Sequence, residues 1–187
     1  MGRLNDLVTE SYNIAKEHGW HEEERSLSAL TLLMQSEVAE VLEEYRKHKR
    51  VDEIWYEIHH EADGCHYTTT GKPGDKPCGI PVEIADLVIR IADYCGKYSI
   101  DLESWTNVAP YPVTETSFEE WLSRINYALS HAWADKDGIL GTSFWLGLAT
   151  SYAFSMATTS KIDLWAVIDE KTAFNRTRPY RHGGKKL

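Results

Sequence analysis

The chain contains 187 residues, carries a net charge of −9 at pH 7 and is 42% hydrophobic. This length suits one domain and is short for two, and the apolar content is that of a folded globular protein. The chain has neither an apolar run of about 18 residues nor a basic-then-apolar start, so we expect a cytoplasmic protein without a membrane segment. The three cysteines have no CxxC spacing, which argues against a disulfide framework.

Positive charge is concentrated near the end of the sequence. Residues 171–187 contain six lysines and arginines and no acid, whereas residues 1–170 contain 14 basic and 29 acidic residues, a charge of −15. Such an acidic body would repel duplex phosphates, so a nucleic-acid partner is not expected. The basic tail over residues 176–187 could still bind nucleic acid, or it could reach back to phosphate held by the acidic body.

Helical periodicity predicts a first helix from about residue 4 to 18, ended by Gly19, and a second from about residue 26 to 48. On a helical wheel the second helix presents one apolar stripe, formed by Leu27, Leu30, Met34, Val38, Val41 and Tyr45. Glu37 falls at the edge of this stripe, and Glu40 lies beside it. The second helix therefore carries acidic side chains next to its buried face.

Residues 51–80 lack a clear period and are rich in Gly, Pro, Thr and His, so we interpret them as an inserted loop with room for a short hairpin. Pro81 suits the first turn of a third helix, which runs to about residue 95. One polar row follows this helix between apolar flanks, and it contains Glu83, Asp86, Arg90 and Asp93. We interpret Asp93 as solvated in preference to a ligand of a second ion, and Arg90 as either a salt-bridge partner or a phosphate contact.

Residues 105–160 are predicted to add further helices. Ser117 to Glu120 reads as a capping box that opens one of them, and others are expected at about 143–158 and 162–175. Clear strand alternation is missing, so the sequence predicts an all-α fold in a single domain over residues 1–187.

A faint internal repeat is also present. Residues 79–102 align without gaps on residues 141–164, and both segments end in Ile-Asp-Leu. Under this alignment the positions of Glu83 and Asp86 are taken by Trp145 and Leu148. We therefore hypothesise that the second copy is a scaffold without the acidic side chains.

Two pairs of acids point to a cation. Glu37 with Glu40, and Glu83 with Asp86, are each spaced i, i+3, which places both members of a pair on one face of their helix. A single pair usually decorates a solvated face, but two pairs beside apolar stripes would be costly to bury without a counter-charge. All-oxygen ligands favour Mg²⁺, or Mn²⁺, over zinc. A di-iron bundle is disfavoured, because it wants an ExxH motif on each of two helices and the one ExxH here lies in residues 51–80.

These four acids resemble the ExxE … ExxD pattern of the MazG-like nucleoside triphosphate pyrophosphohydrolases, which belong to the all-α NTP pyrophosphatase superfamily. The similarity includes the string Ile-Ala-Asp-Leu-Val-Ile-Arg-Ile at residues 84–91 and His18-Gly19-Trp20 after the first helix. Residues 175–185 look like the closing motif of phage and bacterial members. The resemblance covers about half of the chain, namely the first three helices and the final segment.

The resemblance implies a bundle of that superfamily, a homodimer, and Mg²⁺-dependent hydrolysis of an NTP or dNTP between its α and β phosphates, giving a monophosphate and pyrophosphate. It implies metal ligation by Glu37, Glu40, Glu83 and Asp86. It implies phosphate binding by side chains spaced i, i+4, i+7 on the last helix, namely Lys171, Asn175 and Arg178. A metal-held water would be the nucleophile, and Glu40 is the candidate for orienting it.

Several alternatives stay open at this point. Trp20 either stacks on a base or covers the end of the first helix. No zinc-finger spacing is formed by His59, His60, Cys65, His66 and Cys78, so a His-rich loop is preferred to a zinc site. The protein could also be a non-catalytic metal and nucleotide sensor, or an interaction protein that docks on nucleic acid through its basic tail. Retention of all four acids favours the enzyme over the sensor, and nucleic-acid docking predicts salt-sensitive binding without Mg²⁺.

Overall fold

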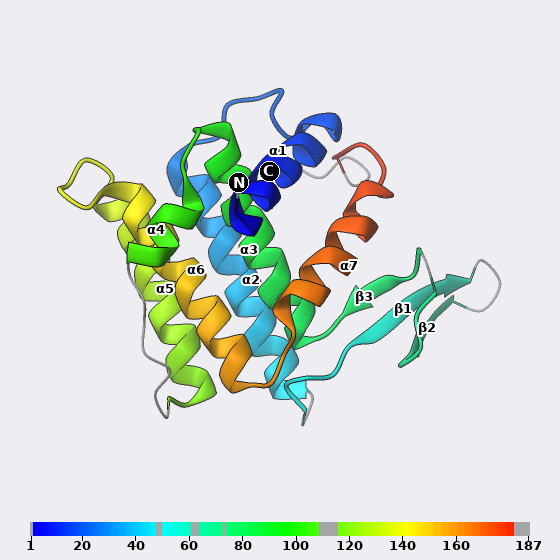
Figure 1. The fold of residues 1–187 in the computed structure, drawn as a ribbon. Coiled ribbons are helices and arrows are strands. Elements are labelled where there is room, and N and C mark those ends of the chain that lie inside the picture. Colours follow the sequence, from blue (N-terminus) through cyan, green and yellow to red (C-terminus); the bar gives the residue numbers. More distant parts are fainter. Residues whose placement is uncertain (1, 48–49, 61–63, 73, 109–115, 182–187) are drawn as a thin grey trace.

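The fold was analysed in a computed structural model that describes residues 2–47, 50–60, 64–72, 74–108 and 116–181 (Figure 1). Within these residues the chain is mainly helical, as predicted, with seven helices and one small sheet. The helices are α1 (Arg3–Glu17), α2 (Leu27–Lys47), α3 (Ile80–Lys97), α4 (Leu102–Val108), α5 (Phe118–Ala134), α6 (Gly141–Thr159) and α7 (Leu164–Arg176). The strands are β1 (Trp55–His60), β2 (Gly64–Thr68) and β3 (Lys76–Cys78). Among the described helices, none combines the length and apolar character that a membrane span requires.

Helix α3 forms the centre of the helical body. It packs against α1, α2, α6 and α7, and its apolar side chains are almost completely enclosed, including Val82, Ala85, Val88 and Ile91. Gly96 allows α1 to come close, because a Cβ atom at this position would lie only 2.5 Å from the Cβ of Tyr12. Any side chain attached to α3 is therefore held on a rigid, buried element.

Most helix boundaries follow from local signals. Gly19 adopts a positive φ of 79° after α1, and the Ser117 side chain accepts a hydrogen bond from the Glu120 N–H at 3.2 Å, which caps α5. Helix α4 was not predicted. It is short, and its signal is Asp101, whose carboxylate accepts the N–H of Ser104 at 3.0 Å.

The inserted segment is expected to be a loop with room for a short hairpin, and the antiparallel pairing of the consecutive strands β1 and β2 agrees with the hairpin. The loop expectation is wrong for β3, which completes an antiparallel sheet with the strand order β2-β1-β3. The all-α class therefore holds for the helical body only. The sheet extends from that body beside α7 in Figure 1. Its strands are short, and β3 pairs with β1 across the strand β2 that intervenes in the sequence, so the pattern along one segment carried little information.

The connection between α3 and α4 recurs 62 residues later between α6 and α7. Ser99 and Lys161 both adopt a positive φ, of 55° and 60°. In each turn the following isoleucine donates its N–H to a carbonyl five residues earlier, at 2.9 Å. Asp101 and Asp163 then cap α4 and α7 through the N–H three residues further on. Positive φ is uncommon for residues other than glycine, so its recurrence at this spacing favours the internal repeat.

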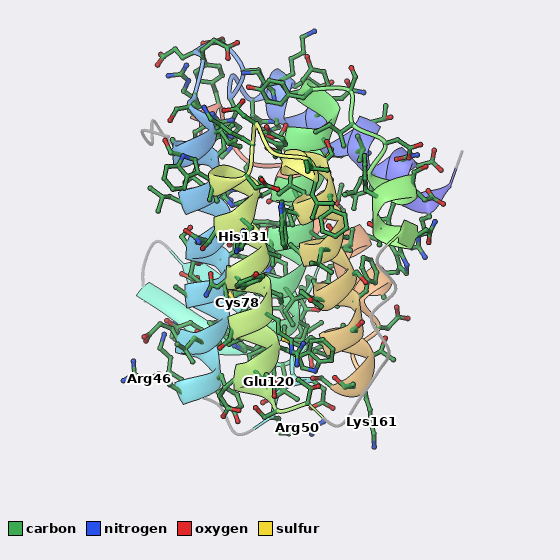
Figure 2. All side chains as sticks on the ribbon, turned by 90° about the vertical axis from the view of Figure 1, so that its left-hand side faces the viewer. Arg46, Arg50, Cys78, Glu120, His131 and Lys161 are labelled. Atoms are coloured by element: carbon green, nitrogen blue, oxygen red, sulfur yellow. The ribbon has the colours of Figure 1, made fainter. Side chains whose placement is uncertain are left out.

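Helices α2 and α5 show a matching pattern of burial. The buried residues of α2 are Leu30, Thr31, Met34, Glu37, Val38 and Val41. Those of α5 occupy the same positions when α2 is advanced by 91 residues, namely Trp121, Leu122, Ile125, Ala128, Leu129 and Ala132. Packing is also reciprocal, since α2 packs on α3 as α5 does on α6, while α7 lies against α3 and α4 lies against α6. Helix α5 runs beside α2 on the face shown in Figure 2.

Candidate metal centre

Three of the four predicted acids converge. Glu37 projects from α2, and Glu83 and Asp86 project from the first turns of α3, which packs along α2. One ligand oxygen from each of these three carboxylates lies within 4.8 Å of the other two. Within the described part of the chain this is the one such group of acidic, histidine or cysteine ligands. The i, i+3 spacing brings the α3 pair together, and helix packing adds Glu37.

Burial makes these carboxylates unusual. Glu37 is only 3% exposed among the apolar side chains of α2. Burial raises its pKa to about 7; Asp86 and Glu40 raise it too, and Arg90 opposes them. Burial and then repulsion from Asp86 raise the pKa of Glu83 to about 8, although Lys171 acts in the opposite direction. A carboxyl group whose pKa is raised in this way is surrounded by too little positive charge to stabilise its ionised form.

Two basic side chains partly supply that charge. Arg90 lies one turn beyond Asp86 on α3 and donates a hydrogen bond to Glu37. Lys171, only 4% exposed, places its Nζ 2.8 Å from Oδ2 of Asp86. Of the two roles open to Arg90, the structure therefore shows the salt bridge. Lysine is rarely buried without a partner, so the Lys171–Asp86 ion pair is built into the fold.

The other predicted phosphate-binding residues lie near the end of α7. Burial lowers the pKa of Arg178, and the nearby charges of Asp86 and Glu37 oppose this effect, which places Arg178 beside the carboxylates. It does not lie on the last helix as predicted, because α7 ends at Arg176 and Thr177 caps it. Asn175 lies in the last turn, and its Oδ1 is buried without a hydrogen-bond partner among the described residues.

Glu40 and Trp20 do not belong to the three-carboxylate group. Glu40 is exposed and does not belong to the group, yet its charge raises the pKa of both Glu37 and Glu83, so it lies close to both. Trp20 follows α1, and the guanidinium carbon of Arg25 lies 5.9 Å from its ring centroid. The base-stacking role of Trp20 stays a prediction.

Sequence reasoning missed a partly buried histidine–carboxylate pair. Nε2 of His21 lies 2.6 Å from Oδ1 of Asp93, and both side chains are at most one-fifth exposed. The interpretation of Asp93 as solvated is therefore wrong. The signal was available on α3, because Asp93 follows Asp86 by two turns on the same polar row, but its partner is 72 residues away.

The histidines and cysteines that were weighed against a zinc site are only partly described. The side chains of His59, His60 and Cys65 and the tail residues 182–187 lie outside the described residues. Cys78 is a buried, free thiol.

Comparisons with protein-family models, curated proteins and solved structures gave no match. The MazG-like assignment therefore stays a prediction.

The three carboxylates suit a hard divalent cation. Their donors are all oxygen, which favours Mg²⁺ or Mn²⁺. The raised pKa values of Glu37 and Glu83 show the deficit of positive charge that such an ion would remove. Glu37, Glu83 and Asp86 would hold the ion directly, and Glu40 at the rim would add a fourth carboxylate.

Without metal, the protein should lose thermal stability as the pH rises. The pKa values of Glu37 and Glu83 in the fold, about 7 and about 8, exceed the ordinary value of 4.5. A raised pKa contributes stability that is complete below the unfolded value and disappears as the pH passes the folded value. Thermal unfolding in EDTA between pH 5 and pH 9 should show this loss, and added Mg²⁺ should reduce it. The same pH dependence in a Glu83→Gln variant would contradict the assignment to Glu83.

Proposed function

We propose that this protein hydrolyses a nucleoside triphosphate, NTP or dNTP, between its α and β phosphates, with Mg²⁺, releasing a monophosphate and pyrophosphate. The observation that carries the proposal is the approach of the Glu37, Glu83 and Asp86 oxygens to within 4.8 Å of one another. The resemblance to MazG-like enzymes supports it from the sequence. The helical body is compatible with the all-α NTP pyrophosphatase fold, which forms part of the proposal.

Bound Mg²⁺ would neutralise phosphate oxygens and lower the pKa of a coordinated water, so no side-chain nucleophile is required. Side chains of the protein supply the other groups that the reaction requires. Lys171 and Arg178 lie beside the carboxylates and can neutralise the charge that develops on the departing pyrophosphate. Asn175 can orient a phosphate through its amide. Glu40 is exposed at the rim and can accept a proton from the attacking water.

Lys171 can contact both Asp86 and the phosphates of a bound triphosphate. Its ammonium group has three donors, and its stem is enclosed by the fold, so the group can move only a short way. In the metal-free state it balances Asp86. A triphosphate bound next to Asp86 offers the same ammonium group a second anionic partner. We therefore assign Lys171 to phosphate binding as well as to charge balance.

A pyrophosphate-release assay tests the proposed function. Purified protein is incubated with each NTP and dNTP, with Mg²⁺ and then with EDTA. We expect pyrophosphate and monophosphate in equal amounts with Mg²⁺, and none with EDTA. Orthophosphate as the first product would contradict cleavage between α and β. Nucleotide binding without any turnover would instead favour the sensor. Homodimer formation stays a prediction. A measurement of the molecular mass of the protein in solution tests it.

A further inference from the structure

The sheet presents one of its faces to the helices that carry the carboxylates. Side chains alternate between faces along a strand, and directly opposed residues on paired strands share a face. Trp55 opposes Cys78, and Glu57 opposes both Tyr67 and Lys76, so these five residues lie on one face. Strand β3 packs against both α3 and α7. The face therefore stands next to the helices of Glu83 and Lys171.

A groove separates this part of the sheet from the last turns of α2. Its volume is about 710 Å³, within the range of about 300–1,000 Å³ typical of small-molecule sites. It is lined by residues that include Glu44, Lys47, Glu53, Trp55 and Tyr67. The rings of Trp55 and Tyr67 meet edge to face, with centroids 5.0 Å apart. The groove thus combines aromatic surface with two carboxylates, and Glu44 is ion-paired with Lys47, whose Nζ lies 3.4 Å from Oε1 of Glu44.

The groove and the metal centre share their supporting elements. On α2, Glu44 lies one turn beyond Glu40 and two turns beyond Glu37, so the carboxylates form a continuous row towards the groove. At the start of α3, a Cβ atom on Gly79 would lie 3.4 Å from the Trp55 ring, and Glu83 follows one turn later. Burial lowers the pKa of Lys76, but its hydrogen bond to Glu57 and nearby negative charges, Glu83 among them, outweigh this effect.

We propose that this groove binds the nucleobase of the triphosphate whose phosphates lie at the metal centre. The inference rests on the proposed function and names the part of the protein that selects the substrate. A base can stack on Tyr67 or Trp55, as aromatic faces accept any base. The carboxylates of Glu44 and Glu53 can accept hydrogen bonds from ring or amino N–H groups. Bases with an exocyclic amino group should therefore bind better than uracil or thymine, which offer fewer donors.

Binding of a non-hydrolysable α,β-methylene triphosphate, measured by calorimetry with Mg²⁺, tests the groove. The Tyr67→Ala variant removes a side chain that is 67% exposed, so the fold should survive. We expect affinity about tenfold weaker than wild type. The matched control is Tyr127→Ala, which removes an exposed tyrosine from α5 and should bind like wild type. Trp55→Ala provides a second groove variant with the same expected direction.

Inorganic tripolyphosphate separates the groove from the metal centre, because it has no base. Its affinity with Mg²⁺ should be the same in wild type, Tyr67→Ala and Trp55→Ala. Wild-type binding of the methylene analogue with no loss in either groove variant would overturn the groove and leave the proposed function intact. Failure of wild type to bind either probe would overturn both. Equal affinity for cytidine and uridine analogues would overturn the role of the two carboxylates.

Discussion

Glu83→Gln should reduce pyrophosphate release by roughly a thousandfold or more, because it removes a proposed metal ligand at the point where phosphate charge would develop. The same change should stabilise the metal-free protein at pH 8. Burial and the neighbouring Asp86 disfavour the Glu83 carboxylate, as its raised pKa of about 8 shows, and a neutral amide of the same shape avoids that cost. The expected signature is therefore loss of turnover together with a higher melting temperature in EDTA.

The control for this experiment is Glu43→Gln on α2. Glu43 is exposed, and its Oε1 accepts a hydrogen bond from Nη1 of Arg46 at 2.8 Å, so it offers an acidic side chain of the same type without burial. The control should retain both activity and stability. Normal turnover in Glu83→Gln would remove Glu83 from the proposed site. Because a variant that fails to fold would also lose turnover, the melting temperature is measured on the same preparation.

Lys171→Met should affect both stability and catalysis. The change keeps a long apolar stem but removes the partner of Asp86, so a buried ion pair loses one member, which costs about 3–5 kcal/mol of unfolding free energy in metal-free protein. Mg²⁺ should restore part of this loss, because a cation at Asp86 replaces the missing charge. KM for a triphosphate should rise about tenfold or more, since a charge-assisted contact to phosphate contributes about 1.5–3 kcal/mol.

Urea unfolding with and without Mg²⁺ and steady-state kinetics measure these two effects separately. Lys136→Met is the control, since Lys136 is exposed beyond α5 and should tolerate the change. Unchanged affinity and rate in Lys171→Met would contradict phosphate binding by this residue. A stability loss that Mg²⁺ leaves untouched would contradict the shared role of Asp86 in ion pairing and metal binding.

The parts of the site that follow helical periodicity were predictable from the sequence. Glu83 and Asp86 share a face because of their spacing, and Glu37 lies at the margin of a readable apolar stripe. The contact between the two helices was an inference from charge, because carboxylates beside apolar stripes need a counter-charge. The position of α2 followed from the same apolar stripe, and the start of α3 followed from Pro81.

What could not be predicted depends on partners distant in sequence. Lys171 is 85 residues from Asp86, and no local pattern distinguishes a buried lysine from a solvated one. The sheet depends on cross-strand pairs such as Trp55 with Cys78, so each strand alone resembled a loop. Arg178 was placed on a helix because its spacing suited one, although the chain had already left the helix at Thr177.

Under the hypothesis of an internal repeat, which the recurrence of the α3–α4 connection at α6–α7 favours, the two halves of the molecule are chemically unequal. At the positions that correspond to Glu40 and Glu83, the second half carries His131 and Trp145, whose rings stack with centroids 4.5 Å apart. Ala128 and Leu148 correspond to Glu37 and Asp86, so that half holds no concentration of negative charge at this place. An aromatic stack coheres without any counterion. If the proposed ion binds, a chelator should thus loosen the α2–α3 side first, while the packing of α5 on α6 should preserve the shape of the empty site.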